Sequence, residues 1–237
     1  MIIRRKLISL LIIAAGALSC APLAMSQAGT SVNEGDWPNI HGDAAARRYS
    51  PLDQINPDNV GDLEIAWNFS TLHFGVGTDY VNPSTPLEVD GVLYANIGST
   101  RNVVALDATN GQVLWLWRYQ EGDRFDEAPR KGAGRGVSYW SDGESARIID
   151  VSPGYQLVSL DAETGIPDPN FGDNGLVDLY VGVRNGEDDR FAYPDIGLSA
   201  PPFVMNDVIV IGAAHRTGGR PRSKFNTKGD VRGFDVH

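Results

Sequence analysis

The chain has almost no cysteine, because Cys20 is the only one among 237 residues. Cys20 lies near the end of an N-terminal apolar stretch, so a chain cleaved after that stretch cannot form an internal disulfide. A small domain stapled by disulfides is therefore excluded, and the fold must rest on a hydrophobic core. Hydrophobic residues make up 42% of the chain, which is ordinary for a globular protein.

Positive charge is also scarce, with 20 Lys and Arg against 30 Asp and Glu, for a net charge of -10. Arg4, Arg5 and Lys6 lie in the leader, so the remainder carries 17 basic and 30 acidic residues, or -13. Nucleic acid binding needs a basic face, so we expect no nucleic acid partner. A small neutral substrate remains compatible with this charge.

The apolar run Leu7 to Leu18 is too short for a good membrane-spanning helix. It follows the basic residues, and the small residues of Ala24-Met25-Ser26 suit a cleavage site. These features predict a signal peptide over residues 1–26 and a periplasmic or secreted location. An uncleaved N-terminal anchor, which would associate the protein with the membrane, is the alternative.

Sustained helical periodicity is missing, and strand signals recur instead from Thr85 onward. Asp90-Gly91 is a two-residue hairpin signal, and Asp107 to Gly111 reads as a second turn. Four short strands are expected around these turns, at 86–89, 92–97, 103–106 and 112–117. Such an up-and-down sheet is typical of one propeller blade.

The pattern repeats along the chain. Ser159 to Gly165 parallels Ala105 to Gly111, and Pro202 to Gly212 parallels Pro86 to Asn96. A third copy begins at Val231, and the longer spacing before it predicts an inserted loop over 215–230. Repeated units bury their faces against neighbours, so we expect the N-terminal part of a longer protein. A β-sandwich is the alternative, but it does not repeat Asp-x-x-Thr/Asn-Gly turns.

The stretch Ala105-Leu106-Asp107-Ala108-Thr109-Asn110-Gly111-Gln112-Val113-Leu114-Trp115 resembles the tryptophan-docking repeat of the pyrroloquinoline quinone (PQQ)-dependent alcohol and glucose dehydrogenases. In that repeat Gly relieves turn strain, Asp bonds local backbone, and Trp fills the wedge between sheets. The second copy has Pro169 where the Trp should stand. Three further stretches are similar to the family: Tyr49 to Asn56, Arg135 to Trp140 and Phe171 to Leu179, the last two resembling the segments after its first and second blades.

The resemblance implies an all-β fold, a partial eight-bladed β-propeller that contains the closing strand, two blades and most of a third. Leu63 to Phe69 is expected as the closing strand, with Trp67 as its docking residue. The expected domains are a signal peptide over 1–26, an N-terminal segment leading into the propeller over 27–62, and an incomplete propeller over 63–237.

The resemblance further implies oxidation of an alcohol or an aldose, with PQQ and calcium as cofactors and a later aspartate as base. Arg135 matches the arginine that contacts the quinone end of PQQ, and Ser199 falls where methanol-oxidising members have a threonine that bonds a cofactor carboxylate. A surface arginine paired with an acid, and a serine in a turn, are the alternatives for these two positions. No catalytic or metal-binding residue is expected in this chain, and the electron acceptor, cytochrome c or quinone, stays open.

Three positions depart from the family pattern. Pro129-Arg130 stands where methanol-oxidising members have adjacent cysteines, and Lys131 where sugar-oxidising members have a histidine. His215 stands near the place of an expected calcium-ligand Glu. A non-catalytic propeller scaffold for protein-protein interaction in the cell envelope is the alternative function. We expect the chain alone to be inactive and prone to aggregation, since unclosed sheet edges and apolar faces would meet water.

Overall fold

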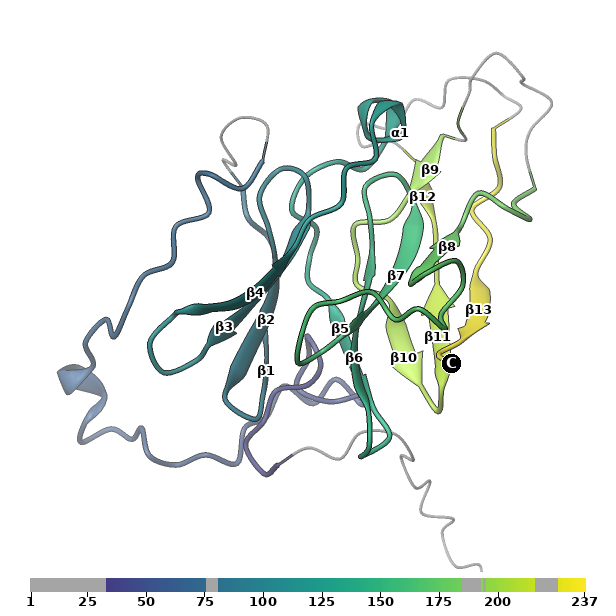
Figure 1. The fold of residues 1–237 in the computed structure, drawn as a ribbon. Coiled ribbons are helices and arrows are strands. Elements are labelled where there is room, and N and C mark those ends of the chain that lie inside the picture. Colours follow the sequence, from purple (N-terminus) through teal and green to yellow (C-terminus); the bar gives the residue numbers. More distant parts are fainter. Residues whose placement is uncertain (1–32, 76–80, 185–192, 194, 216–225) are drawn as a thin grey trace, which may run out of the picture.

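A computed structural model describes residues 33–75, 81–184, 193, 195–215 and 226–237. The expected signal peptide over 1–26 and most of the expected inserted loop lie outside these ranges. The described part is almost entirely sheet, with three larger sheets standing side by side in sequence order (Figure 1). Its helices are η1 (Val60–Asp62) and α1 (Asp123–Glu127). No helix in the described ranges has the length and hydrophobicity to cross a membrane.

Blade 1 is the antiparallel sheet β1-β2-β3-β4 and agrees with the strands expected from the sequence. Asp90 and Gly91 have φ values of 52° and 77°, which suits a two-residue hairpin between Val89 and Val92. The Asp107 carboxylate accepts hydrogen bonds from the backbone and hydroxyl of Thr109. The strands are β1 (Leu87–Val89), β2 (Val92–Ile97), β3 (Asn102–Asp107) and β4 (Val113–Trp117).

Blade 2 is the antiparallel sheet β5-β6-β7-β8. Its outermost strand, β8, falls inside the stretch Phe171 to Leu179, so the expectation that this stretch follows the second blade is wrong. Pro167 forms an isolated β-bridge with Leu160 of β7. The chain then leaves the sheet and returns as β8, which pairs with β7. The strands are β5 (Ser138–Ser141), β6 (Ala146–Val151), β7 (Gln156–Asp161) and β8 (Leu176–Asp178).

Blade 3 is the sheet β10-β11-β13, and the short pair β9-β12 lies at the upper end of this sheet in Figure 1. Asn206 and Asp207 both have positive φ and form the same kind of two-residue hairpin as Asp90-Gly91. The strands are β9 (Ile196–Gly197), β10 (Phe203–Met205), β11 (Val208–Ile211), β12 (Ala214–His215) and β13 (Arg232–Asp235).

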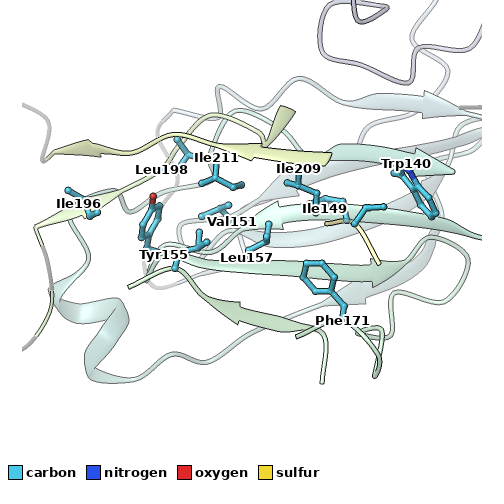
Figure 2. Close-up of a cluster of buried hydrophobic side chains, with 12 residues drawn as sticks. Trp140, Ile149, Val151, Tyr155, Leu157, Phe171, Ile196, Leu198, Ile209 and Ile211 are labelled. Atoms are coloured by element: carbon cyan, nitrogen blue, oxygen red, sulfur yellow. The ribbon is translucent and has the colours of Figure 1, made fainter. Parts of the chain in front are cut away.

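The blades pack face to face, so the middle strands β3 and β7 are buried on both faces. The first junction, between blades 1 and 2, is a cluster around Leu87, Val103 and Ile148. The second junction, between blades 2 and 3, buries Ile149, Leu157 and other side chains drawn in Figure 2 against Ile209 and Ile211. Burial on both faces is the arrangement that stacked propeller blades require.

Two tryptophans dock on glycine turns as expected. The Trp67 indole donates to Ala108 O at 3.1 Å, and its ring occupies the space that a Cβ on Gly111 would need. The Trp115 indole donates to Ala162 O at 2.9 Å, and its ring lies in the same way against Gly165. Both glycines also have φ near 70°, so a side chain there would meet both strain and a clash.

The stretch Leu63 to Phe69 forms no strand ladder with the described residues, although the sequence predicts a strand there. Leu63 and Ile65 are exposed, whereas Trp67 and Phe69 pack on the outer face of blade 1. The docking residue is therefore placed as expected, without the strand pairing that would surround it.

Candidate functional site

A chain of backbone hydrogen bonds joins the segments that lead into the first strand of each blade. The Thr85 N–H donates to Arg135 O at 3.1 Å, and the Arg135 N–H donates to Ser199 O at 2.9 Å. These residues precede β1, β5 and β10 respectively. The structure therefore brings Arg135 and Ser199, the two predicted cofactor-binding residues, side by side.

The Arg135 side chain is exposed and makes no hydrogen bond or ion pair with the described residues. Gly134 and Gly136 flank it, and a Cβ on either would come within 3.0 Å of the Arg101 guanidinium or of Thr85 O. The glycines thus let this loop lie directly on the blades beneath it. A free guanidinium just before the start of β5 suits a carboxylate-bearing ligand, because its fork binds such groups in pairs of hydrogen bonds. Ser199 is half-buried and contributes a hydroxyl at the same end.

Arg101 lies beneath the loop of residues 128–137, which we call the Arg135 loop. It is 3% exposed and has a φ of 54°, at the end of the turn between β2 and β3. Its guanidinium donates to four backbone carbonyls: Gly132 at 3.1 Å, Arg130 at 2.7 Å, Val151 at 2.7 Å and Leu198 at 2.6 Å. Burial lowers the pKa of this arginine, while the charge of Asp150 acts in the opposite direction.

Asn96 and Asp150 form a second buried contact below the Arg135 loop. The Asn96 amide donates to Asp150 Oδ2 at 3.0 Å, and its oxygen accepts from the Gly136 N–H at 3.2 Å. Burial raises the pKa of Asp150 to about 7, although Arg101 and the Asn96 hydrogen bond lower it. The contact joins blade 1 to blade 2 and reaches the residue after Arg135.

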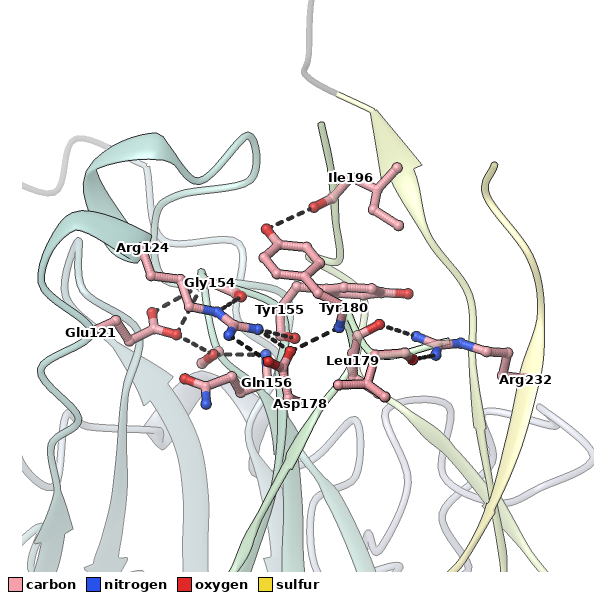
Figure 3. A network of polar contacts seen from close by, with 12 residues as sticks. Glu121, Arg124, Gly154, Tyr155, Gln156, Asp178, Leu179, Tyr180, Ile196 and Arg232 are labelled. Carbon is pink, nitrogen blue, oxygen red and sulfur yellow. Dashed lines mark hydrogen bonds and ion pairs between the residues drawn. The ribbon is translucent and has the colours of Figure 1, made fainter. Parts of the chain in front are cut away.

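The segment before the Arg135 loop is fixed to blade 2 by the network in Figure 3. The Arg124 guanidinium donates to Gly154 O at 2.6 Å and to both oxygens of Asp178, and it lies 4.4 Å from the Tyr180 ring centre. The hydrogen bond from Arg124 lowers the pKa of Asp178. The Glu121 carboxylate accepts from the Gly154 N–H and the Ser152 hydroxyl, and burial raises its pKa.

Three positions that depart from the family pattern have structural roles. Pro129 and Arg130 pack against Gly197 of β9. Lys131 turns back to α1, where its ammonium donates to Asp126 O at 2.7 Å. The His215 ring contacts Asp195 O at 3.0 Å and is half-buried in β12.

The remaining tryptophans pack within the fold. Trp140 is 3% exposed, and its indole donates to Asp207 Oδ1 at 2.9 Å. Trp117 stacks on Tyr119 with ring centres 5.6 Å apart. Trp37 pairs its backbone with Glu88 on β1. Trp140 and Trp117 therefore serve packing.

The described residues contain no cluster of three His, Cys, Asp or Glu side chains that could hold a metal ion. Sequence analysis missed Arg101, Asn96 and Asp150, which support the Arg135 loop. A signal was present for two of them, since Asn96 and Asp150 are polar residues flanked by apolar residues in their strands. Buried polar side chains are usually hydrogen-bonded to something the fold must hold in place.

Comparison with known proteins agrees with the propeller fold. The family model described as "PQQ: Glucose/ethanol/alcohol dehydrogenase, beta-propeller domain" matches residues 37–237. The glycerol dehydrogenase large subunit of Gluconobacter thailandicus is 29% identical over 92% of this chain and 29% of its own length. The quinoprotein glucose dehydrogenase of Escherichia coli (strain K12) is 29% identical over 94% of this chain and 28% of its own length.

Among solved structures, the quinohemoprotein alcohol dehydrogenase from Comamonas testosteroni superimposes with a TM-score of 0.62 and 26% identity. The alignment covers 85% of this chain and 26% of that chain. The chain thus spans less than a third of the length of the relatives it matches. Because the family match runs from the N-terminal segment through all three blades, this chain belongs to the family of PQQ-dependent glucose, ethanol and alcohol dehydrogenases.

Proposed function

We propose that this chain forms part of a PQQ-dependent dehydrogenase that oxidises an alcohol or an aldose, and that it supplies one wall of the cofactor pocket. The observation that carries the proposal is the 2.9 Å backbone hydrogen bond between Arg135 and Ser199. This bond joins the backbones of a residue with a free guanidinium and a residue with a hydroxyl, just before β5 and β10, which supports a shared role for the two. The relatives' names cover glycerol, glucose and alcohol, so the substrate class is a CH–OH group rather than one compound.

The donor set fits PQQ, which carries three carboxylates and an ortho-quinone. Arg135 would hold an anionic or quinone oxygen of the cofactor, and Ser199 would donate its hydroxyl to a carboxylate. When bound, PQQ supplies the quinone that accepts the hydride, and calcium acts as the Lewis acid in the complete enzyme. We assign calcium to no residue of this chain. The contribution of the chain is to bind and orient.

The matched test compares Arg135→Ala with Arg118→Ala. Arg118 directly follows β4, is exposed, and places its guanidinium over the Phe74 ring. Both variants lose one positive charge. Loss of a hydrogen bond to a charged group weakens binding by about 1.5–3 kcal/mol, or about tenfold or more. We expect PQQ with calcium to quench tryptophan fluorescence, with this loss of affinity for Arg135→Ala alone. Equal affinity of both variants for PQQ would contradict the proposal.

We also propose that the protein is exported to the periplasm and that this chain does not turn over substrate by itself. The basic and apolar leader supports export. The chain covers less than a third of the length of its relatives, and this supports inactivity, because the pocket of a propeller is built from several blades. Turnover of an alcohol or glucose with PQQ, calcium and a dye acceptor measures this directly. Multiple turnovers by the chain alone would overturn the claim of inactivity.

A further inference from the structure

The hydrogen bonds of the Arg101 side chain reach both halves of the proposed cofactor wall, the Arg135 loop and the Leu198–Ser199 segment. Two of its acceptors, Arg130 O and Gly132 O, belong to the Arg135 loop. A third, Leu198 O, belongs to the residue directly before Ser199. The fourth, Val151 O, is at the end of β6 in blade 2. One guanidinium in blade 1 therefore ties the backbone around both cofactor residues to the adjoining blade.

This use of a charge is unusual for a merely structural contact. A cation that is 3% exposed loses its hydration, and four carbonyl dipoles must compensate for that loss. An apolar residue would satisfy packing at a hairpin end without this cost. The planar fork of arginine can reach four acceptors in several directions, which the single ammonium of lysine cannot do. Gly134 also leaves room for the guanidinium, since a Cβ there would lie 2.9 Å from Arg101 Nε.

We propose that Arg101 is a positioning residue for the cofactor pocket, which holds the Arg135 loop and the Leu198–Ser199 segment in a fixed relation. The inference rests on the proposed function of Arg135 and Ser199. It assigns Arg101 no contact with the cofactor. Its effect is to keep the Arg135 N–H bonded to Ser199 O, so that the two cofactor-facing side chains start from a rigid backbone.

The first test needs no cofactor. Arg101→Lys keeps the charge but cannot bond all four carbonyls. We expect amide hydrogen exchange to rise by at least about tenfold at Gly132 and Arg135, whose N–H groups are hydrogen-bonded in the parent. Exchange in the central ladder between β6 and β7 should stay unchanged. Unchanged exchange in the Arg135 loop, or a uniform rise through both blades, would overturn the proposal.

The second test measures PQQ binding by fluorescence quenching with Arg101→Lys, Arg124→Lys and Arg135→Ala side by side. Arg124 fixes the segment before the Arg135 loop to blade 2, and its guanidinium does not bond the carbonyls that Arg101 holds. Arg124→Lys is therefore the matched control, because it also replaces a bonded guanidinium with an ammonium. We expect a loss of PQQ affinity of about tenfold for Arg101→Lys and a smaller one for Arg124→Lys. Parent affinity in Arg101→Lys would refute the positioning role. Parent affinity in Arg135→Ala would instead refute the proposed function, whatever the exchange data show.

Discussion

At each of the two junctions between blades, a side chain donates a hydrogen bond to the backbone carbonyl at the equivalent position of the repeat. The donor residue differs between the two junctions. In the first junction, Trp115 donates its indole N–H to Ala162 O and lays its ring on Gly165. In the second, Pro169 stands in the place of the tryptophan, and the Arg147 guanidinium donates to Val236 O. Val236 follows Asp235 as Ala162 follows Asp161, so the acceptors are equivalent in the repeat. The repeat thus preserves the carbonyl to be satisfied rather than the residue that satisfies it.

The change of donor alters what stabilises each junction. Trp115 contributes mainly by burying apolar area, which depends little on salt or pH. Arg147 pairs with Asp168 at 2.6 Å, and the two side chains are only 16% and 12% exposed. The Arg147 guanidinium also lies 5.3 Å from the Trp140 ring centre. A mostly buried ion pair needs both partners, because removal of one leaves the other charge uncompensated.

The largest effect is expected from Trp115→Ala at the first junction. Removal of a buried tryptophan leaves a cavity and should lower the free energy of unfolding by about 3–5 kcal/mol. Urea unfolding followed by far-UV circular dichroism measures this without relying on the deleted fluorophore. Trp117→Ala is the control, since Trp117 is half-buried and docks on no glycine turn. Equal losses in the two variants would mean that docking adds nothing to ordinary burial.

Arg147→Met should lower the free energy of unfolding by about 3 kcal/mol, because Asp168 is left with little solvent and no cation. Arg184→Met is the matched control. Arg184 pairs with Asp230 on the surface, where an ion pair contributes about 1 kcal/mol or less. The same urea titrations report both variants.

The double variant Arg147→Met, Asp168→Leu sharpens this test. If the unpaired Asp168 carboxylate causes the loss of stability in Arg147→Met, the double variant should regain most of the stability of the parent protein. A double variant as unstable as Arg147→Met would show that packing on Trp140 and the hydrogen bond to Val236 O, rather than charge pairing, hold the second junction.

Local features of the fold were predictable from the sequence because they depend on neighbouring residues. Asp90-Gly91 forms the expected two-residue hairpin, and Asp107 bonds Thr109 in the expected turn. Trp67 docks as the repeat predicts, through Gly111. Turn geometry and alternation are decided within a few residues, so four strands of blade 1 could be placed before the structure was known.

Long-range contacts were not predictable in the same way. Pro169 signalled that the second junction differs, but not that Arg147 would take over the hydrogen bond, because the two residues meet only through the fold. The sequence predicts that Phe171 to Leu179 follows blade 2, whereas β8 within this stretch pairs with β7. The excursion of the chain after Pro167 hides this pairing from a reading of the sequence. For the site, sequence comparison selected Arg135 and Ser199, whereas Arg101 beneath them emerged only from its acceptors.

The smallest effect concerns the polar contact within the first junction, where Asn96 donates to Asp150. Burial raises the pKa of Asp150 to about 7, above its unfolded value of 3.8, so the folded state holds a proton that the unfolded state releases. That contribution to stability is present below pH 4 and is lost as the pH rises through 7. Asp150→Asn keeps an oxygen acceptor and removes the titration. Relative to Asp150→Asn, the free energy of unfolding of the parent should fall by about 2 kcal/mol between pH 5 and pH 7.5. Urea unfolding at both pH values measures the difference, and a stability difference between the parent and Asp150→Asn that does not change over this interval would show that Asp150 is ionised throughout.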